Sequence, residues 1–321
     1  MAVQFGVFVP QGWKMDLVEI AEPVEKFEAM TGVARAADEG GFDSIWVYDH
    51  FHTVPETTME ATFECWTITA TLARDTRRVK IGQMVGCNGY RNPALYAKIA
   101  STVDVASHGR LLAGIGAGWH KEEWEAYGYS WPERRERMGQ FREAVEIVHT
   151  MWTEERPTFE GKYYQIDRPV NEPKGAGKAK IPLWIGGGGE QVTPKLVARY
   201  GDACNVGGGD PNVVKQKLAI LREHCEAVGR DYSEITKSTN VNVHLVESEA
   251  TAERETAAAR GNEDFASYAK RFMVGTPASI RARLEPLVAA GADYIIAYMP
   301  RVAYDQTSVR RFAREIIPHF A

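Results

Sequence analysis

The amino-acid sequence predicts an α/β fold of the (β/α)8 type, the TIM barrel. Short runs rich in β-branched and aromatic residues alternate with longer segments in which apolar residues recur every three or four positions. This alternation repeats eight times along 321 residues, and about 40 residues a unit suits such a barrel with insertions. Strand order cannot be read from a sequence, so a doubly wound open sheet is the alternative fold.

The fingerprints of nucleotide-binding open sheets are missing. GxGxxG fails at GIGAGW, where Trp119 takes the place of the last glycine, and the glycine run after Ile185 also lacks the third glycine. The phosphate-loop pattern GxxxxGK[ST] is absent as well. These absences favour the barrel.

The expected strands share short apolar runs that end at glycine, aspartate or another turn residue. They lie at Val3–Val9, Ser44–Tyr48, Val79–Val85, Leu111–Ile115, Ile181–Ile185, Asp202–Val206, Ile235–Val246 and Asp293–Met299.

The expected helices follow these strands and begin at capping residues. Asn92 and Asp210 each stand before a proline, which suits the first helical position, and Gly40–Gly41 closes the first helix. The helices are expected at Phe27–Glu39, Ala61–Arg74, 93–108, 141–152, Pro194–Tyr200, from Pro211 onward, 251–272, 277–290 and Ser308–Ile317.

Residues 153–180 interrupt the alternation. EGKYYQID predicts a small hairpin, and PKGAGKAK predicts a flexible basic loop. The segment is too short for a second domain. We therefore expect residues 1–321 to form a single barrel domain, with 153–180 as an insertion or lid between the fourth and fifth strands.

Composition and charge exclude several classes of protein. Hydrophobic residues make up 44% and charged residues 25%, which is ordinary for a soluble globular protein. The net charge is −5, which argues against nucleic-acid binding, and Arg134, Arg135 and Arg137 stand among glutamates as on a solvated helix face. No apolar run of about 18 residues could cross a membrane.

The cysteines and the N-terminus indicate a cytoplasmic protein. MAVQFGVFVPQG lacks the basic start of a signal peptide. The four cysteines are far apart and form no CxxC pair, which predicts free thiols in a reducing compartment. They are Cys65, Cys87, Cys204 and Cys225.

The glycine run Gly186–Gly189 is the strongest sign of a binding site. It follows an expected strand and precedes Thr193-Pro194, which should cap and start a helix. A tight turn with positive φ would need only one or two glycines. Four bare residues beside a helix start let backbone N–H groups converge on a phosphate.

Two histidines follow the second strand in the segment DHFH. His50 and His52 would lie on one side of an extended chain, as in zinc hydrolases, if His120 or His244 completed the ligand set. A histidine that hydrogen-bonds a cofactor or moves a proton is the other functional interpretation. A histidine that only closes the loop is the structural one.

The segments after the third and fourth strands could build the walls of a pocket. Cys87 is a conceivable nucleophile, although a lone cysteine is more often inert. Gly116–Gly118 would let a flat ligand approach the backbone, with Trp119, His120 and Trp124 around it, or would serve barrel closure alone. Glu122 and Glu123 should be first-turn helix residues that the dipole favours.

Three segments together resemble the bacterial luciferase-like superfamily, and within it the actinobacterial oxidoreductases that use the deazaflavin coenzyme F420. The segments are WVYDHFH, KIGQMVGCNGYRNPALYAKIASTVDVASHGRLLAGIGAGWHKEEWEAYGY and PLWIGGGGEQVTPKLVARYGDACN. The resemblance extends from Phe5 to about Tyr298. It implies a barrel that binds a flavin or deazaflavin at its C-terminal mouth, usually in a homodimer.

The resemblance also implies roles for individual residues. His50 and His120 become the candidate catalytic residues. A bulge near Gln83–Met84, often with a non-prolyl cis peptide, backs the ring. The cofactor-binding residues that it implies are Asp49, His50, Gln83, Met84, Cys87, Ala117, Gly118, Trp119, Gly187, Gly188, Gly189, Glu190 and Gln191.

The expected activity is hydride transfer between F420 and a small organic substrate, with no bound metal. An FMN-dependent monooxygenase would use the same barrel, whereas a metal-dependent hydrolase and a non-catalytic flavin carrier are more distant alternatives. Some deazaflavin dehydrogenases carry an acid where Trp119 and His120 stand, so a sugar-phosphate substrate is not implied. Lysines of the insertion could meet the polyglutamate tail of F420. They are Lys174, Lys178 and Lys180.

Overall fold

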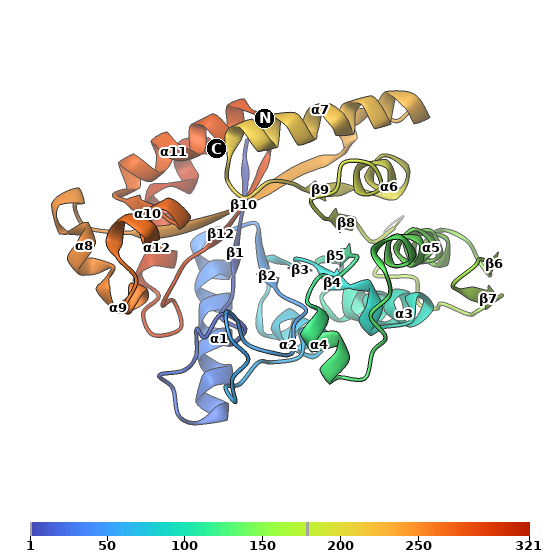
Figure 1. The fold of residues 1–321 in the computed structure, drawn as a ribbon, viewed down its shortest axis with the longest axis horizontal. Coiled ribbons are helices and arrows are strands. Elements are labelled where there is room, and N and C mark those ends of the chain that lie inside the picture. The colour runs from blue at the N-terminus through green and yellow to red at the C-terminus, as the bar shows by residue number, and fades with distance from the viewer. Residues whose placement is uncertain (1, 178–179) are drawn as a thin grey trace.

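Eight parallel strands close into a barrel in the computed structural model, which describes residues 2–177 and 180–321. The circle runs β1-β2-β3-β5-β8-β9-β10-β12 and returns to β1 (Figure 1). This closure confirms the (β/α)8 prediction over the open sheet. The barrel strands are β1 (Gln4–Phe8), β2 (Ser44–Val47), β3 (Lys80–Gln83), β5 (Leu111–Gly116), β8 (Leu183–Gly186), β9 (Ala203–Asn205), β10 (Thr236–Leu245) and β12 (Tyr294–Tyr298).

Helices surround the barrel and bury their apolar faces against it (Figure 1). The helices of eight or more residues are α1 (Pro23–Gly40), α2 (Cys65–Asp75), α3 (Pro93–Ala106), α5 (Arg134–Thr153), α6 (Thr193–Tyr200), α7 (Pro211–Val228), α11 (Pro277–Ala289) and α12 (Thr307–Glu315). The shorter ones are α4 (Lys121–Ala126), α8 (Ala252–Glu255), α9 (Ala257–Arg260) and α10 (Phe265–Arg271). The 3-10 turns are η1 (Asn88–Tyr90), η2 (Tyr232–Glu234), η3 (Glu249–Thr251) and η4 (Ile317–Phe320).

The helical segment expected over residues 251–272 is present, but it is divided into the short helices α8, α9 and α10, with η3 before them. Gly261 takes a positive φ of 55° and ends α9, and the Asp264 side chain accepts from the Ser267 N–H to begin α10. Two short strands were also not anticipated, β4 (Gly86–Cys87) beside β5 and β11 (Met273–Gly275) beside β10.

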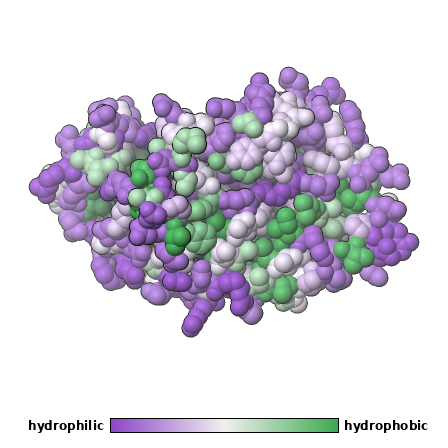
Figure 2. Space-filling view, turned by 90° about the horizontal axis from the view of Figure 1, so that it is seen from below, coloured by the Kyte–Doolittle hydropathy of each residue, from purple (hydrophilic) through white to green (hydrophobic). Residues whose placement is uncertain are grey.

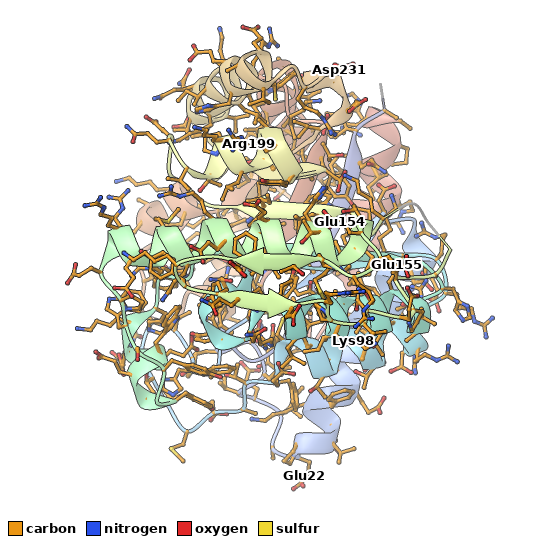
Figure 3. All side chains as sticks on the ribbon, turned by 90° about the vertical axis from the view of Figure 1, so that its right-hand side faces the viewer. Glu22, Lys98, Glu154, Glu155, Arg199 and Asp231 are labelled. Carbon is orange, nitrogen blue, oxygen red and sulfur yellow. The ribbon has the colours of Figure 1, made fainter. Side chains whose placement is uncertain are left out.

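The insertion forms an antiparallel hairpin of β6 (Thr158–Glu160) and β7 (Gln165–Asp167). Figure 3 shows it running alongside α5. The Glu143 carboxylate of α5 accepts from the backbone N–H groups of residues 162–164 and fixes the tip of the hairpin to the helix. The predicted hairpin is therefore present, and it packs on the outside of the barrel.

Aromatic rings fill the barrel interior, and small residues on neighbouring strands leave the space that these rings need. Trp46 pairs across β2 and β3 with Gly82, and its indole N–H donates to the Ser44 hydroxyl at 2.6 Å. The same hydroxyl oxygen lies 2.7 Å from the hydroxyl of Tyr294. Trp184 completes this layer, 4.7 Å from the Trp46 ring. The barrel is thus a packed core below its mouth.

The outer surface gives no single large apolar face in the view of Figure 2. That face is mostly hydrophilic, with hydrophobic residues in separate patches. The exposed large hydrophobic side chains include Val24 of α1, Leu95 of α3 and Val170 of the insertion. The homodimer remains a prediction. Within the described residues, no helix is long and apolar enough to cross a membrane.

We expect Gly82→Ala to destabilise the barrel. A Cβ at this position would lie 2.4 Å from Cζ3 of Trp46 and 2.9 Å from the Leu112 carbonyl oxygen, on strands that cannot move apart freely. Overpacking of this kind costs about 1–3 kcal/mol, which a urea unfolding curve would measure. Gly188→Ala is the matched control, because its Cβ would meet nothing within 4 Å. Equal unfolding midpoints for the two variants would contradict this account of the interior.

Candidate active site

A pocket of about 1150 Å³ opens at the C-terminal ends of the barrel strands. Its walls come from the segments that follow β2, β3, β5 and β8, and from the facing sides of α5 and α7. The mouth of a (β/α)8 barrel is the usual place for function. Most of the residues expected to bind the cofactor line this pocket, as does the catalytic candidate His120. These cofactor-binding residues are Asp49, His50, Met84, Cys87, Ala117, Gly118, Trp119, Gly187, Gly188, Gly189, Glu190 and Gln191.

Gln83 is the expected residue that the pocket does not include. Its side-chain amide donates to Thr69 Oγ1 of α2 at 3.0 Å, and its Oε1 accepts from the Gly114 N–H at 3.3 Å. Strand alternation therefore turns Gln83 outward, toward the helices. The non-prolyl cis peptide lies one position later than expected, at Met84–Val85. The Val85 side chain occupies the space that Gly116 and Gly186 leave open on neighbouring strands.

One buried carboxylate, Glu123 of α4, organises the wall opposite the glycine loop. Its Oε2 accepts from Nδ1 of His50 at 2.9 Å and from the hydroxyl of Tyr90 at 2.6 Å. Its Oε1 accepts from the backbone N–H groups of Phe51 and His52. The side chain is fully buried. The expectation that Glu123 is only a first-turn residue favoured by the dipole is therefore too narrow.

These hydrogen-bond donors stabilise the ionised form of the Glu123 carboxylate. Burial by itself raises the pKa of the carboxyl, but the hydrogen bonds from His50, Tyr90 and the His52 N–H outweigh it and lower the pKa to about 2. The group therefore stays ionised at neutral pH. Its contribution to stability is present above the ordinary value of 4.5 and is lost only as the pH falls toward 2.

His50 lies at the centre of an aromatic wall. Its ring stacks on Trp13 with centroids 4.2 Å apart and planes 4° apart. The rings of Trp119 and His120 lie 5.6 and 5.9 Å away. Nδ1 of His120 is 3.7 Å from Oε2 of Glu123, and it has no hydrogen-bond partner among the described residues. The structure thus brings both candidate catalytic histidines to one carboxylate.

The pair of metal ligands suggested by DHFH does not form. His50 faces Glu123, whereas the ring of His52 lies beside Tyr127. His244 lies against Tyr268, with Nδ1 2.7 Å from its hydroxyl, and burial lowers the pKa of His244 to about 4. Within the described chain, the group of His50, His120 and Glu123 has the ligand atoms closest to a metal arrangement, within 4.8 Å of one another.

Asp49 ties the loop after β2 to β4. Its carboxylate accepts from the Cys87 N–H at 2.7 Å and from both terminal nitrogens of Arg91, at 2.6 and 3.1 Å. Arg91 also contacts Glu64 at 2.6 Å. Burial, and then the negative charge of Asp49, raise the pKa of the Cys87 thiol well above its ordinary value, and Arg91 offsets only part of this increase. Cys87 therefore shapes the wall as a neutral thiol.

The glycine loop presents bare backbone to the pocket. Residues 187–191 are exposed, and among the described residues no acceptor takes the N–H groups of Gly188, Gly189 or Glu190. Lys217 of α7 fixes the loop from behind, because its Nζ donates to the Gly188 carbonyl and to Glu190, each at 2.8 Å. α6 begins at Thr193 with Val192 at its N-cap and no side-chain cap, one residue earlier than expected.

Several pocket residues escaped the sequence analysis. Trp13 lies far from any recognisable motif, and Tyr90, although it lies within the segment GCNGYRNP, was not selected as a site residue. Arg134, Arg135 and Arg142 of α5 line the rim of the pocket, although the first two had been assigned to a solvated face. The helical spacing could have placed Arg135 and Arg142 on one face of a helix. It could not have predicted which other element that face would contact.

Two of the three lysines expected to meet the cofactor tail, Lys174 and Lys180, do not reach the mouth. Lys180 pairs with Asp202 at 2.6 Å, before β9, and Lys174 donates to the carbonyls of Met151 and Glu154 at the far end of α5. Figure 3 labels Glu154 at that end of the helix. The loop precedes β8, so it lies at the N-terminal end of the barrel. Lys178 lies outside the described residues.

The sequence matches known proteins over most of its length. Residues 3–294 match the family model described as luciferase-like monooxygenase. An F420-dependent glucose-6-phosphate dehydrogenase of Kineococcus radiotolerans is 30% identical, with 89% of this chain and 90% of the relative covered. The enzyme of the same name from Amycolatopsis mediterranei is 26% identical, with 89% and 92% covered.

Solved structures share the fold. The monooxygenase RslO1 from Streptomyces bottropensis superimposes with a TM-score of 0.82 at 22% identity, covering 99% of this chain and all of the other. An F420-dependent secondary alcohol dehydrogenase, solved with an F420–acetone adduct, gives 0.78 at 21% identity with both chains fully covered. The family match and the 30% relative decide the assignment: the chain belongs to the luciferase-like monooxygenase family.

Proposed function

We propose that this protein is an oxidoreductase that transfers a hydride between coenzyme F420 and a small organic substrate. The observation that carries the proposal is the pocket itself, which joins a bare glycine backbone to an aromatic wall around two histidines. Similarity to relatives named as F420-dependent dehydrogenases supports it. We also propose that the protein works in the cytoplasm as a homodimer, and its four buried free cysteines are consistent with a reducing compartment.

The residues at the two ends of the pocket fit a phosphate-bearing ring cofactor. The free N–H groups of Gly188, Gly189 and Glu190 would hold the phosphate, since no side chain obstructs them. Met84, Ala117 and Gly118 would lie along the ring, where small side chains and exposed backbone permit close approach. The bound deazaflavin supplies the hydride chemistry.

His50 would hold or move the proton that accompanies hydride transfer. An ionised carboxylate can only accept, so Glu123 keeps the hydrogen of His50 on Nδ1 and leaves Nε2 available to the substrate. Stacking on Trp13 fixes the plane of the ring. His120 is the second candidate acid or base, because its Nδ1 has no protein partner among the described residues.

Two other functions use the same residues. An FMN-dependent monooxygenase would place the FMN phosphate on the same glycine loop, and structural neighbours include an FMN-bound Baeyer-Villiger monooxygenase. A metal-dependent hydrolase would use His50, His120 and Glu123, whose ligand atoms lie within 4.8 Å of one another. Stoichiometric zinc in the purified protein, lost together with activity on chelation, would favour the hydrolase.

Cofactor titration tests the proposal directly. We expect F420 to quench the intrinsic fluorescence of the tryptophans at micromolar concentration, because Trp13 and Trp119 line the pocket, and FMN to bind at least about tenfold more weakly, a difference of about 1.4 kcal/mol. Tighter binding of FMN would instead support the monooxygenase, and binding of neither would remove the oxidoreductase proposal.

Gly188→Val should weaken cofactor binding at least about tenfold without unfolding the protein. The added side chain enters open space in the loop, since a Cβ there meets nothing within 4 Å, and it obstructs approach to the N–H groups. Fluorescence titration measures the affinity, and thermal melting confirms folding. Gly208→Val, on the loop after β9 and outside the residues that line the pocket, is the matched control, because its Cβ also meets nothing within 4 Å. Wild-type affinity in Gly188→Val would exclude the loop as the phosphate site.

Glu123→Gln should lower kcat about 10- to 100-fold and change its pH profile, because His50 loses the carboxylate that fixes its hydrogen. Turnover would be followed by deazaflavin absorbance with a panel of small alcohols, carbonyl compounds and sugar phosphates, beginning with glucose 6-phosphate. Glu122→Gln removes the same charge from the neighbouring position, where the carboxylate contacts only exposed Thr57 at 3.0 Å. If both variants keep the wild-type pH profile, His50 and Glu123 do not form the proton-handling pair.

A further inference from the structure

Three arginines of α5 form a cationic rim at the edge of the pocket. Arg134 and Arg135 lie in the first turn of the helix, and Arg142 lies two turns further along. Arg135, Met138 and Arg142 follow the helical spacing of one face, and all three line the pocket. We call Arg134, Arg135 and Arg142 the α5 arginine rim.

The rim has no carboxylate partner in the described part of the chain. Among the described residues, no acid lies within salt-bridge distance of Arg134, Arg135 or Arg142, whereas Arg91, Arg271 and Arg301, for example, each pair with a carboxylate. The acids of the same helix do not neutralise the rim. Glu143, for example, is already engaged by the N–H groups of the hairpin tip. Arg137 on another face is occupied, with its guanidinium 4.0 Å from the Trp131 ring and a bond to the Pro132 carbonyl.

The position of these cations is unfavourable for the helix itself. The N-terminal turn carries a partial positive charge, so Arg134 and Arg135 are unfavourable there, and Glu133 at the N-cap and Glu136 in the first turn offset part of this repulsion. An anion bound beside the rim would offset it further.

Among the described residues that line the pocket, no other lysine or arginine is free of a carboxylate partner. Lys217, across the pocket, already donates to the Gly188 carbonyl and to Glu190. Beyond the rim, Arg135 and Arg142 also line a second, open hollow of about 630 Å³, whose other charged residues are Lys162, Glu133, Glu136 and Glu143. A chain of anionic groups that left the glycine loop would therefore meet Arg135 and Arg142 where the pocket and this hollow adjoin.

We propose that the α5 arginine rim binds the carboxylates of the oligoglutamate tail of the deazaflavin coenzyme, an inference that rests on the proposed function. Planar guanidinium groups pair with carboxylates in two parallel hydrogen bonds. FMN ends at its phosphate and carries no such groups. The rim therefore favours F420 over FMN, because only F420 carries negatively charged carboxylates beyond its phosphate. The glycine loop alone would bind the phosphate of either cofactor.

The test compares two forms of the coenzyme, one with a long glutamate tail and one that ends at the phospholactyl group. Dissociation constants are measured at low and moderate salt for the wild-type protein and for Arg135→Gln/Arg142→Gln. Wild-type protein should bind the long-tailed form about 5- to 30-fold more tightly, as expected for two or three exposed ion pairs, and salt should reduce this ratio. In the double variant the ratio should fall to about one or two.

The control is Arg254→Gln, an exposed arginine of α8 on the opposite side of the molecule from α5 (Figure 1). It changes the net charge near a helix without touching the rim, so the tail ratio should stay at the wild-type value. The substituted rim residues are exposed, and thermal melting should confirm that the variants are folded.

The outcomes separate this inference from the function on which it rests. If wild-type protein binds both forms of the coenzyme with equal, salt-independent affinity, the α5 arginine rim does not bind the glutamate tail. That result would not contradict the proposal that the protein binds F420. The inference is also overturned if Arg254→Gln reduces the ratio as much as the rim variant does. If neither form binds, the proposed function fails, and the inference fails with it.

Discussion

The arrangement of the mouth depends on a single buried charge, the carboxylate of Glu123. It accepts hydrogen bonds from His50, Tyr90 and two backbone N–H groups, and these come from the segments after β2 and β4. A buried carboxylate with fewer partners would be unstable, because desolvation opposes its charge. With four donors the charge is retained, and α4 becomes the point at which two loops of different barrel units are joined. The orientation of His50 follows from this junction.

The barrel and the mouth are held together by different interactions. Below the mouth, aromatic rings such as Trp46 and Trp184 fill the interior, and Gly82 provides the space they need. At the mouth, the corresponding positions carry charge pairs such as Asp49 with Arg91, or bare backbone. Aromatic packing makes the barrel interior below the mouth rigid. At the mouth, polar groups remain that have unused hydrogen-bond donors or acceptors. This division explains how a stable scaffold can support a site that leaves N–H groups and a histidine nitrogen unpaired.

The sequence was sufficient for the barrel because each strand is a local apolar run and each helix a local periodicity. All eight barrel strands lie within or at the edges of their expected ranges. The glycine loop and DH segment were found because they follow strands, whose C-terminal ends meet at one face. Glu123 was misjudged because a first-turn glutamate is equally typical of a solvated helix, and its burial arises only when β2 and α4 meet. Lys174 and Lys180 were assigned to the wrong end of the barrel, because the composition of a loop does not indicate at which end it lies.

The two sides of the pocket differ in how their charges are balanced, and this difference bears on specificity. On the α7 side, Lys217 is neutralised by a glycine carbonyl and Glu190, so its role is to hold the loop. On the α5 side, the arginines have no such partner among the described residues, so their charge remains available to a ligand. The free N–H groups can serve any phosphate, and the aromatic wall can serve any flat ring. The unpaired guanidinium groups of Arg134, Arg135 and Arg142 are therefore the feature of this pocket that we propose to distinguish one ring cofactor from another.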